Sequence, residues 1–399
     1  MKNNWQTKKL GEICEIVKDI PLIFNGEKNY FSTGAIDNSG FKLPEKVTHK
    51  NKPSRANSYP KNGDVGFAKM KFTNKTLLID QDLEGSIFST GFCFLRPSKL
   101  LNSKYLFHFI ISDEFQKLKD LYAGDGIMGG INNYDVKNIE ISFPSIVEQK
   151  KIAKILNEVS KKTNTAKENI EKNLVNSQEL LESYLQNIFI NKGADWEEIE
   201  FGKIIELLTD YHANGSYKVL KANVELKKSE DYAWMVRSTD FENNFKNDKR
   251  YITQKSYDFL KKSKIFGNEI IICKIGNAGK VYLMPEIDRP CSLAMNSFLA
   301  RMDDKKCSSE YIYRFLNSQS GREQIEARIL GTTTKTITKD NVRSIKIPLP
   351  SIKEQKSIVK KLDALSGQTK KLEEIYKKKI ADLDELKKSV LKKAFNGEL

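Results

Sequence analysis

One stretch of the chain occurs twice, and this duplication constrains the fold more than any other feature of the sequence. The first copy begins Pro144-Ser145-Ile146 and the second begins Pro350-Ser351-Ile352, 206 residues later. Each copy continues Xaa-Glu-Gln-Lys, and no gap interrupts the correspondence between residues 105–189 and residues 311–395. A repeat at a fixed offset predicts two copies of one structural unit.

Each copy opens with the signals of a helix start. Ser145 and Ser351 are the predicted N-caps, and Glu148 and Glu354, three residues later, are placed to close capping boxes. Apolar residues then recur every three to four positions along a highly charged sequence, which predicts the narrow seam of a coiled coil. About 44 residues rising 1.5 Å each give a rod of roughly 66 Å. Such a rod does not bury its seam alone, so we expect the two copies to pair antiparallel with each other.

The composition is that of a soluble protein with two to three domains. Apolar residues make up 39% and charged residues 30% of the 399 positions. No apolar run approaches the roughly 18 residues of a membrane span, and the segment Met1–Trp5 lacks the apolar region of a signal peptide. We therefore expect a cytoplasmic protein that does not contact a membrane.

The cysteines and histidines predict neither a disulfide framework nor a metal site. The five cysteines are widely spaced, odd in number and free of any Cys-Xaa-Xaa-Cys pair, which indicates buried thiols in a reducing compartment. The three histidines have no metal-ligand spacing to each other or to a cysteine. We expect no metal and no cofactor in this chain.

Outside the duplicated helices, the sequence predicts two mixed α/β heads. In the first head, short strands are expected at 65–70, 77–79, 86–96 and 139–143, and a helix over 105–119. The offset between the halves grows from 191 to 206 residues within the globular parts, so one scaffold carries two different heads. The predicted class is α+β, with a pseudo-twofold repeat of two α/β heads joined by two long helices. The predicted segments are a first head at 1–142, a first helix at 143–191, a second head at 192–348 and a second helix at 349–399.

The charge points to nucleic acid, whereas signs of catalysis are weak. The net charge of +15 favours a polyanion as partner. The chain has no Pro-Pro, which the motif of a DNA amino-methyltransferase requires, and residues 276–281 lack the spacing and the hydroxyl of a nucleotide-binding loop. The only nuclease-like feature is Asp210 with Glu225-Leu226-Lys227. A stand-alone nuclease or methyltransferase and a coiled-coil adaptor stay open as alternatives.

Three stretches together give the chain a family likeness. They are the doubled Pro-Ser-Ile-Xaa-Glu-Gln-Lys helix start, the ending 393–399 (Lys-Ala-Phe-Asn-Gly-Glu-Leu) and the opening of the second head at 209–217. With these, the whole chain resembles the specificity (S) subunits of type I restriction-modification systems. The first head departs from the usual pattern, because residues 67–75 lack the Lys-Xaa-Gly-Xaa-Xaa-Gly-Lys run found at 274–280.

The resemblance implies a non-catalytic subunit that binds double-stranded DNA. Each head would be a target recognition domain for one half of a bipartite, asymmetric site. The helices would set the spacing between the halves and dock two methyltransferase (M) subunits, which restriction (R) subunits would join. Methylation and cleavage would then belong to those partners.

Residue type and position indicate which side chains of the heads contact DNA. Lysine and asparagine suit phosphates and base edges, and glycines let the backbone approach a ligand closely. These criteria select a glycine-rich turn and a threonine-rich loop in the second head, one arginine that follows a strand, and the corresponding lysines of the first head. The predicted contacts are Lys69, Lys71, Lys75, Arg237, Lys274, Asn277, Lys280 and Lys335.

Overall fold

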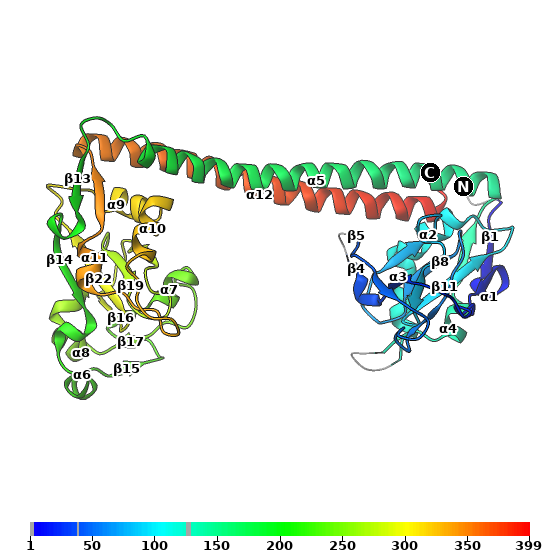
Figure 1. Cartoon of the computed structure of the whole chain (residues 1–399), viewed down its shortest axis with the longest axis horizontal. Coiled ribbons are helices and arrows are strands. Elements are labelled where there is room, and N and C mark those ends of the chain that lie inside the picture. The colour runs from blue at the N-terminus through cyan, green and yellow to red at the C-terminus, as the bar shows by residue number, and fades with distance from the viewer. Residues whose placement is uncertain (1–3, 38–39, 125–128) are drawn as a thin grey trace. The chain divides into compact units, whose positions relative to one another are not determined.

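The computed structural model of the protein describes residues 4–37, 40–124 and 129–399. By its contacts the chain divides into two compact units: unit 1 comprises residues 1–172 and 376–399, and unit 2 comprises residues 173–375. Each unit contains one globular head and part of both long helices, α5 (Ile146–Ile190) and α12 (Ile352–Asn396), which are drawn in green and in orange to red in Figure 1.

The head of unit 1, called head 1 below, is built on two four-stranded sheets. The first has the order β2-β11-β8-β9 and is antiparallel throughout. The second has the order β6-β3-β10-β7, in which β3 and β10 run parallel. The strands are β2 (Cys14–Ile16), β3 (Lys28–Phe31), β6 (Glu45–Val47), β7 (Ala56–Ser58), β8 (Val65–Ala68), β9 (Thr76–Leu78), β10 (Ile87–Ser89) and β11 (Phe92–Pro97), with a small separate pair β4 (Ile36–Asp37) and β5 (Gly40–Phe41).

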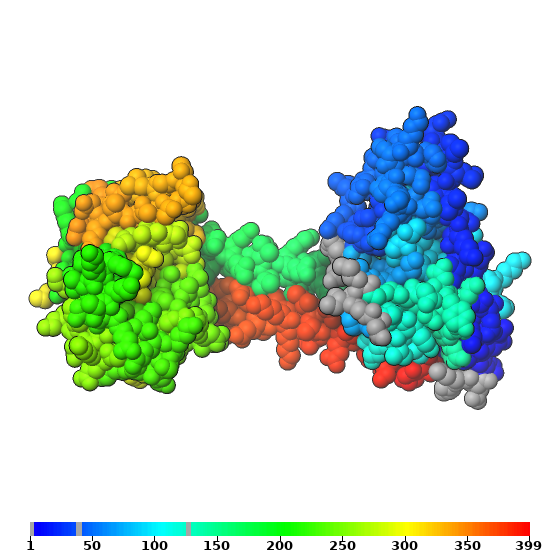
Figure 2. Space-filling model, turned by 90° about the horizontal axis from the view of Figure 1, so that it is seen from below, coloured from blue at the N-terminus to red at the C-terminus, as the bar shows by residue number. Residues whose placement is uncertain are grey.

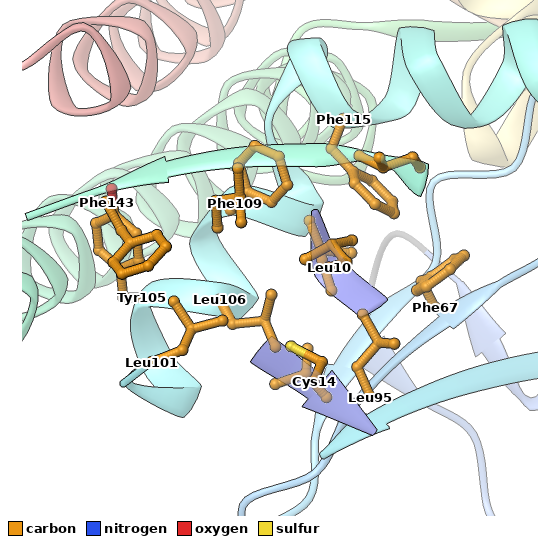
Figure 3. Close-up of a cluster of buried hydrophobic side chains, with 14 of the residues drawn as sticks. Leu10, Cys14, Phe67, Leu95, Leu101, Tyr105, Leu106, Phe109, Phe115 and Phe143 are labelled. Atoms are coloured by element: carbon orange, nitrogen blue, oxygen red, sulfur yellow. The ribbon is translucent and has the colours of Figure 1, made fainter. Parts of the chain in front are cut away.

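Helices and a two-stranded ribbon cover the first sheet and enclose the main core of head 1. The helices supply Tyr105, Phe109 and Phe115, which belong to one buried cluster with Phe67 and Leu95 of the sheet (Figure 3). Phe115 packs edge to face on Phe67, at 5.0 Å between ring centroids. All five side chains are buried, so this cluster fixes the helices on the sheet. The elements are α1 (Leu10–Ile13), α2 (Ser103–Ile111), α3 (Asp113–Tyr122), α4 (Asn133–Asn138) and the antiparallel ribbon of β1 (Gln6–Lys9) with β12 (Glu140–Phe143).

The head of unit 2, called head 2, repeats this plan. Its first sheet has the order β14-β22-β19-β20, and its second, β15-β17-β16-β21-β18, again contains one parallel pair, β16 with β21. The strands are β13 (Glu197–Glu200), β14 (Ile205–Asp210), β15 (Leu226–Lys227), β16 (Ala233–Val236), β17 (Tyr251–Ile252), β18 (Lys264–Ile265), β19 (Ile270–Cys273), β20 (Val281–Leu283), β21 (Cys291–Leu293), β22 (Ser297–Met302) and β23 (Lys346–Leu349). The helices are α6 (Tyr217–Asn223), α7 (Ser238–Glu242), α8 (Gln254–Phe259), α9 (Ser309–Leu316), α10 (Gln319–Glu326) and α11 (Lys339–Arg343).

The α+β class and the duplicated two-head architecture are confirmed, whereas two local predictions for head 1 are wrong. The helix expected over 105–119 is interrupted at Ser112, whose backbone is extended (ψ 150°) and whose hydroxyl accepts the Phe115 N–H. A serine that caps a new helix favours a break over continuation. The strand expected over 86–96 is two strands, β10 and β11, which belong to different sheets.

Each long helix is capped by the predicted serine. A glutamine four residues after each serine, Gln149 or Gln355, binds the helix to its head. Ser145 Oγ accepts the Glu148 N–H at 3.4 Å, and Ser351 Oγ accepts the Glu354 N–H at 3.3 Å. The carboxylate of Glu354 accepts the indole N–H of Trp196 at 3.1 Å.

Gln149 is fully buried and makes three hydrogen bonds to the backbone. It accepts the Asn102 N–H and donates to the carbonyl oxygens of Leu100 and Pro144, all at 2.8–2.9 Å. Gln355 repeats these bonds in unit 2 with Ser308, Lys306 and Pro350. The duplicated glutamine therefore joins helix and head, because a buried amide with all these bonds satisfied holds both parts in one arrangement.

Within each unit the two helices run antiparallel, and the last turn of one completes the core beneath the start of the other. In unit 1, Lys167 of α5 pairs with Asp384 of α12, and the buried ring of Phe395 packs against Tyr105 at 5.2 Å between centroids. In unit 2, Phe189 of α5 packs in the same way against Phe315 at 5.1 Å. Of the helices described, none is long and apolar enough to cross a membrane.

A polar contact beside this seam differs between the units. In unit 1, the buried His108 of α2 bonds through Nε2 to Asn157 Oδ1 of α5 at 2.9 Å. In unit 2, Arg314 of α9 forms an ion pair with Asp363 of α12, at positions 206 residues further along. Burial lowers the pKa of His108 to about 4, so the histidine is neutral near pH 7.

Candidate nucleic-acid interface

Each head carries a loop of equal length that begins and ends with lysine. In head 1 the lysine loop is residues 69–75, between β8 and β9, and in head 2 it is residues 274–280, between β19 and β20. The strand registers align the two loops, since Phe67 pairs with Thr76 and Ile272 pairs with Val281. The structure thus brings Lys69, Lys71 and Lys75 into one loop, and Lys274, Asn277 and Lys280 into the other.

A neighbouring segment is tied to each loop by backbone hydrogen bonds. In head 1 the Ile131 N–H donates to the Lys69 carbonyl oxygen at 3.0 Å, and in head 2 the Ile337 N–H donates to the Lys274 carbonyl oxygen at 3.1 Å. The head 2 segment contains Lys335, which is exposed at a turn closed by the bridge between Leu330 and Thr336. Lys335 therefore lies on a segment held directly beside the head 2 loop.

A buried carboxylate beneath the head 2 loop holds two lysines. Asp210, 8% exposed, accepts Lys274 Nζ at 3.1 Å and Lys339 Nζ at 3.2 Å on its two oxygens. Burial opposes ionisation of Asp210, but the two ammonium groups outweigh it and lower the pKa of the carboxyl. Asp210, the nuclease-like acid of the sequence, thus accepts hydrogen bonds from lysines on both oxygens.

The other end of the head 2 loop is held by Glu242 of α7. Its Oε1 accepts Lys280 Nζ at 2.8 Å, the Tyr282 hydroxyl at 3.2 Å and, at the longer distance of 3.5 Å, Asn277 Nδ2. The hydrogen bond from Lys280 is the main reason that the pKa of Glu242 is lowered. Lys280 is half exposed, so its ammonium group is available to a phosphate that competes with Glu242.

Arg237 lies outside the loop and supports the segment that follows it. Its guanidinium donates to the fully buried Asp240 at 2.8 Å and also contacts Asp248. These hydrogen bonds, first of all the one to Asp240, raise the pKa of Arg237. Because α7 also supplies Glu242, Arg237 orders the helix that holds Lys280.

The head 1 loop is held from beneath by a buried lysine that sequence reasoning missed. Lys119 of α3 has a fully buried side chain and donates from Nζ to the carbonyl oxygens of Thr73 at 2.6 Å and Met70 at 3.3 Å. Its neighbour Asp120 accepts the Phe72 N–H at 3.0 Å. Desolvation lowers the pKa of Lys119, and Asp120 opposes this shift. Among the predicted lysines, Lys75 is also held, since its Nζ donates to the Thr33 carbonyl oxygen at 2.7 Å.

The lysine loops carry cations, amides and one exposed ring, which suit phosphates, base edges and base faces respectively.

The cysteines lie elsewhere, in the cores. All five are free and buried, and burial raises the pKa of Cys14, Cys93, Cys291 and Cys307 to about 12. In the part of the chain that the structure describes, no group of three or more His, Cys, Asp or Glu side chains is arranged to hold a metal ion.

The sequence is similar to those of known proteins over most of its length. The family model for the type I restriction modification DNA specificity domain matches residues 2–176 and again residues 193–381. The MjaVIII specificity subunit of Methanocaldococcus jannaschii is 23% identical over 370 residues, covering 83% of this chain and 82% of its own. The EcoKI specificity subunit of Escherichia coli K12 is 26% identical over 327 residues, covering 77% of this chain and 68% of its own.

Solved structures share the fold over the full length. A chain from a study of complex assembly and conformational transition in the type I R-M system superposes with a TM-score of 0.80 at 20% identity, covering 100% of this chain and 99% of its own. The HsdS subunit from Thermoanaerobacter tengcongensis superposes with a TM-score of 0.65 at 21% identity, covering 100% of this chain and 98% of its own.

Proposed function

The chain belongs to the type I restriction-modification DNA specificity family, and we propose that head 1 and head 2 each read one half of a bipartite, asymmetric DNA site. Its role is DNA recognition, without catalysis of its own. The observation that carries the proposal is the pair of lysine loops: they have the same length and the same place on the fold, but different residues between their terminal lysines. Loops that match in position and differ in side chains suit two different half-sites.

We propose that Lys69 and Lys280 at the loop ends bind phosphates, that Lys75 and Lys274, held by the Thr33 carbonyl oxygen and by Asp210, support the loops, and that the residues between the terminal lysines reach the bases. A phosphate contact sets the register of a protein on DNA but carries no sequence information, whereas a side chain at a base edge does. Asn277 is the base-reading candidate in head 2, because an amide can pair with an adenine edge. Lys335 and Arg237 flank this loop, and we assign Lys335 to a phosphate and Arg237 to support of α7.

The helices α5 and α12 are proposed to set the spacing of the half-sites and to bind the methyltransferase subunits, two per chain, to which restriction subunits are added. Figure 2 shows part of both helices, α5 in green and α12 in red, and the helices expose apolar side chains among their charges, with Val175 51%, Leu180 59% and Ile375 48% exposed. Exposed apolar residues on a charged helix suit a protein partner. We retain the boundaries 1–142, 143–191, 192–348 and 349–399 as the proposed limits of heads and helices.

Exchange of one head tests the proposal. The chain with residues 1–142 replaced by the head of another family member is expressed with its methyltransferase subunits, and methylated positions are mapped by sequencing of the genomic DNA. We expect one half of the methylated sequence to change while the other half and the spacing stay the same. A change in both halves at once would contradict the assignment of one half-site to each head.

Salt dependence tests the phosphate contacts. Each neutralised phosphate contributes about 0.9 to the slope of log affinity against log salt. Lys69→Ala and Lys335→Ala should each weaken binding to all sequences alike and lower that slope by about one. An unchanged slope in both variants would remove these lysines from the interface.

A further inference from the structure

Phe72, at the tip of the head 1 lysine loop, is exposed although it is a large apolar residue. Its side chain is 78% exposed, whereas Phe67, five residues earlier in the adjoining strand, is fully buried. Met70, in the same loop, is 46% exposed. An apolar ring displayed in water at the end of a hairpin suits burial against a partner.

The backbone at Phe72 has a conformation that its residue type disfavours. Its φ is +59°, in the left-handed region that glycine and asparagine adopt far more readily than a bulky residue. The head 2 loop instead has its positive φ values at two glycines, Gly276 and Gly279, at +81° and +85°. The head 1 loop contains no glycine, and Asn277 of head 2 is the counterpart of Phe72. A ring kept in an unfavourable conformation indicates a function for the ring rather than for the turn.

Residues of α3 hold the backbone at the tip of the loop in place. Lys119 Nζ binds the carbonyl oxygens of Met70 and Thr73, on either side of Phe72, and Asp120 accepts the Phe72 N–H. These bonds hold the loop backbone before any ligand binds. A ring on a preorganised loop loses little conformational freedom on insertion into a partner.

The charges around the ring favour DNA over protein. No Asp or Glu occurs between Asp64 and Asp80, and three lysines lie in the loop. Lys71 Nζ lies 5.5 Å from the centre of the Phe72 ring. The carboxylate at the tip, Asp120, accepts the Phe72 N–H and lies 3.5 Å from Lys119 Nζ, so it is paired within the protein. A flat apolar ring beside an ammonium group matches a polyanion whose interior consists of stacked flat bases.

We propose that Phe72 is a wedge that enters between stacked bases of the half-site read by head 1, while Lys69 and Lys71 bind the flanking phosphates. The inference rests on the proposed function of the loop and adds a deformation of the DNA at one base step. The half-site of head 2, which meets Asn277, undergoes no such insertion. Base steps that unstack readily are then preferred beneath Phe72, so the ring contributes to specificity without a hydrogen bond to a base.

The test uses the full chain in complex with its methyltransferase subunits and duplexes that carry the fluorescent base 2-aminopurine at successive positions of the site, which methylation mapping defines first. Unstacking raises the fluorescence of this base. The positions at which the methyltransferase extrudes its target base are left out of the comparison, because extrusion also raises the fluorescence. At the other positions the wild type should give a rise at one step of the head 1 half-site and none in the head 2 half-site. Phe72→Asn, which tolerates positive φ and keeps the backbone N–H, should abolish the rise and weaken binding about 5- to 100-fold. Phe72→Trp should retain both the fluorescence rise and the affinity of the wild type.

Three controls separate the outcomes. Leu22→Asn removes another exposed apolar side chain of head 1, 83% exposed, and should leave fluorescence and affinity unchanged. If Phe72→Asn behaves like the wild type while Lys69→Ala with Lys71→Ala weakens binding, the wedge is wrong and the loop's role stands. If both variants bind as the wild type does, the proposed site itself fails. If Phe72→Asn loses the methyltransferase subunits in gel filtration without DNA, the ring contacts protein and the wedge is overturned.

Discussion

Head 1 and head 2 carry lysine loops of equal length on opposite kinds of support. Beneath the head 1 loop lies the buried ammonium group of Lys119, and at the corresponding place 206 residues later lies the apolar Ile325. Ile325 packs against Gly279, where a Cβ would overlap its Cγ2 atom, so the backbone lies directly on the side chain. At this one position the scaffold thus supports the loop either by hydrogen bonds to its carbonyls or by close apolar packing, the latter beside the bonds that Lys274 and Lys280 make to Asp210 and Glu242.

This difference teaches which parts of the repeat are free to vary. The glutamine joints, the aromatic ends of the helices and the equal loop lengths are common to both units, and they determine where a loop is presented. The residue beneath the lysine loop and the residue at its tip differ between the heads, and they determine which side chains the loop presents. Four experiments test this division.

We expect the largest effect from the phenylalanine near the C-terminal end of each long helix, a feature that both units have. Phe395→Ala should destabilise unit 1, and Phe189→Ala unit 2, by about 3–5 kcal/mol each, because each ring is buried in a head core and leaves a cavity. Hydrogen exchange should show the loss in α2 for the first variant and in α9 for the second. Leu386→Ala, at a position 50% exposed, is the control and should cost little. Equal loosening of both heads by either variant would contradict two separate cores.

Next comes the glycine on which the head 2 loop depends. Gly279→Ala places a Cβ against Ile325 at φ +85°, and crowding together with backbone strain should cost about 2–4 kcal/mol. Asn74→Ala, the matched exposed position of head 1, should stay within about 0.5 kcal/mol. Chemical denaturation followed by hydrogen exchange of each loop measures both. Similar costs at the two positions would mean that the supports do not differ.

The polar contact beside the seam predicts an acid sensitivity of unit 1 that the corresponding contact of unit 2 does not share. Folding lowers the pKa of His108 from 6.5 to about 4. Between these two pH values the unfolded chain therefore binds a proton that the folded unit does not bind. The stability of unit 1 should therefore fall as the pH drops from about 6.5 to about 4, by up to about 3 kcal/mol. Arg314 of unit 2 stays charged over this range. His108→Gln should flatten the dependence measured by calorimetry, and an unaltered slope would assign it to other groups.

The smallest effect concerns the supports themselves. Lys119→Met leaves the carbonyl oxygens of Met70 and Thr73 without their donor and should cost about 1–3 kcal/mol. Ile325→Met conserves volume and should cost less than about 1.5 kcal/mol. Amide exchange within residues 69–75 should rise in the first variant, with weaker binding of the head 1 half-site alone. Equal loosening of the head 2 loop by Ile325→Met would remove the contrast.

The sequence predicts the long-range order of this chain better than the details of its site. A single offset between the copies reveals the gapless repeat, and local capping signals predict the serines at which the long helices start. Gln149 and Lys119 read as surface residues by type, because their burial depends on carbonyl groups of distant segments. The break at Ser112 is hidden by apolar residues that keep a helical rhythm across it. Phe72 lies outside the predicted strand 65–70, among the lysines selected as DNA contacts, but its apolar type gives no sign of such a contact, and the hairpin register places it at a tip.

The ring of Phe395 imposes an order of events on biosynthesis. The strands of head 1 leave the ribosome early, but the aromatic side chain that fills the base of their core belongs to α12 and is translated only after the whole of unit 2. The head made first is therefore finished last. Until then the core of head 1 lacks the ring that packs on Tyr105 and Phe109, so we expect head 1 to be less stable in the growing chain than in the complete one.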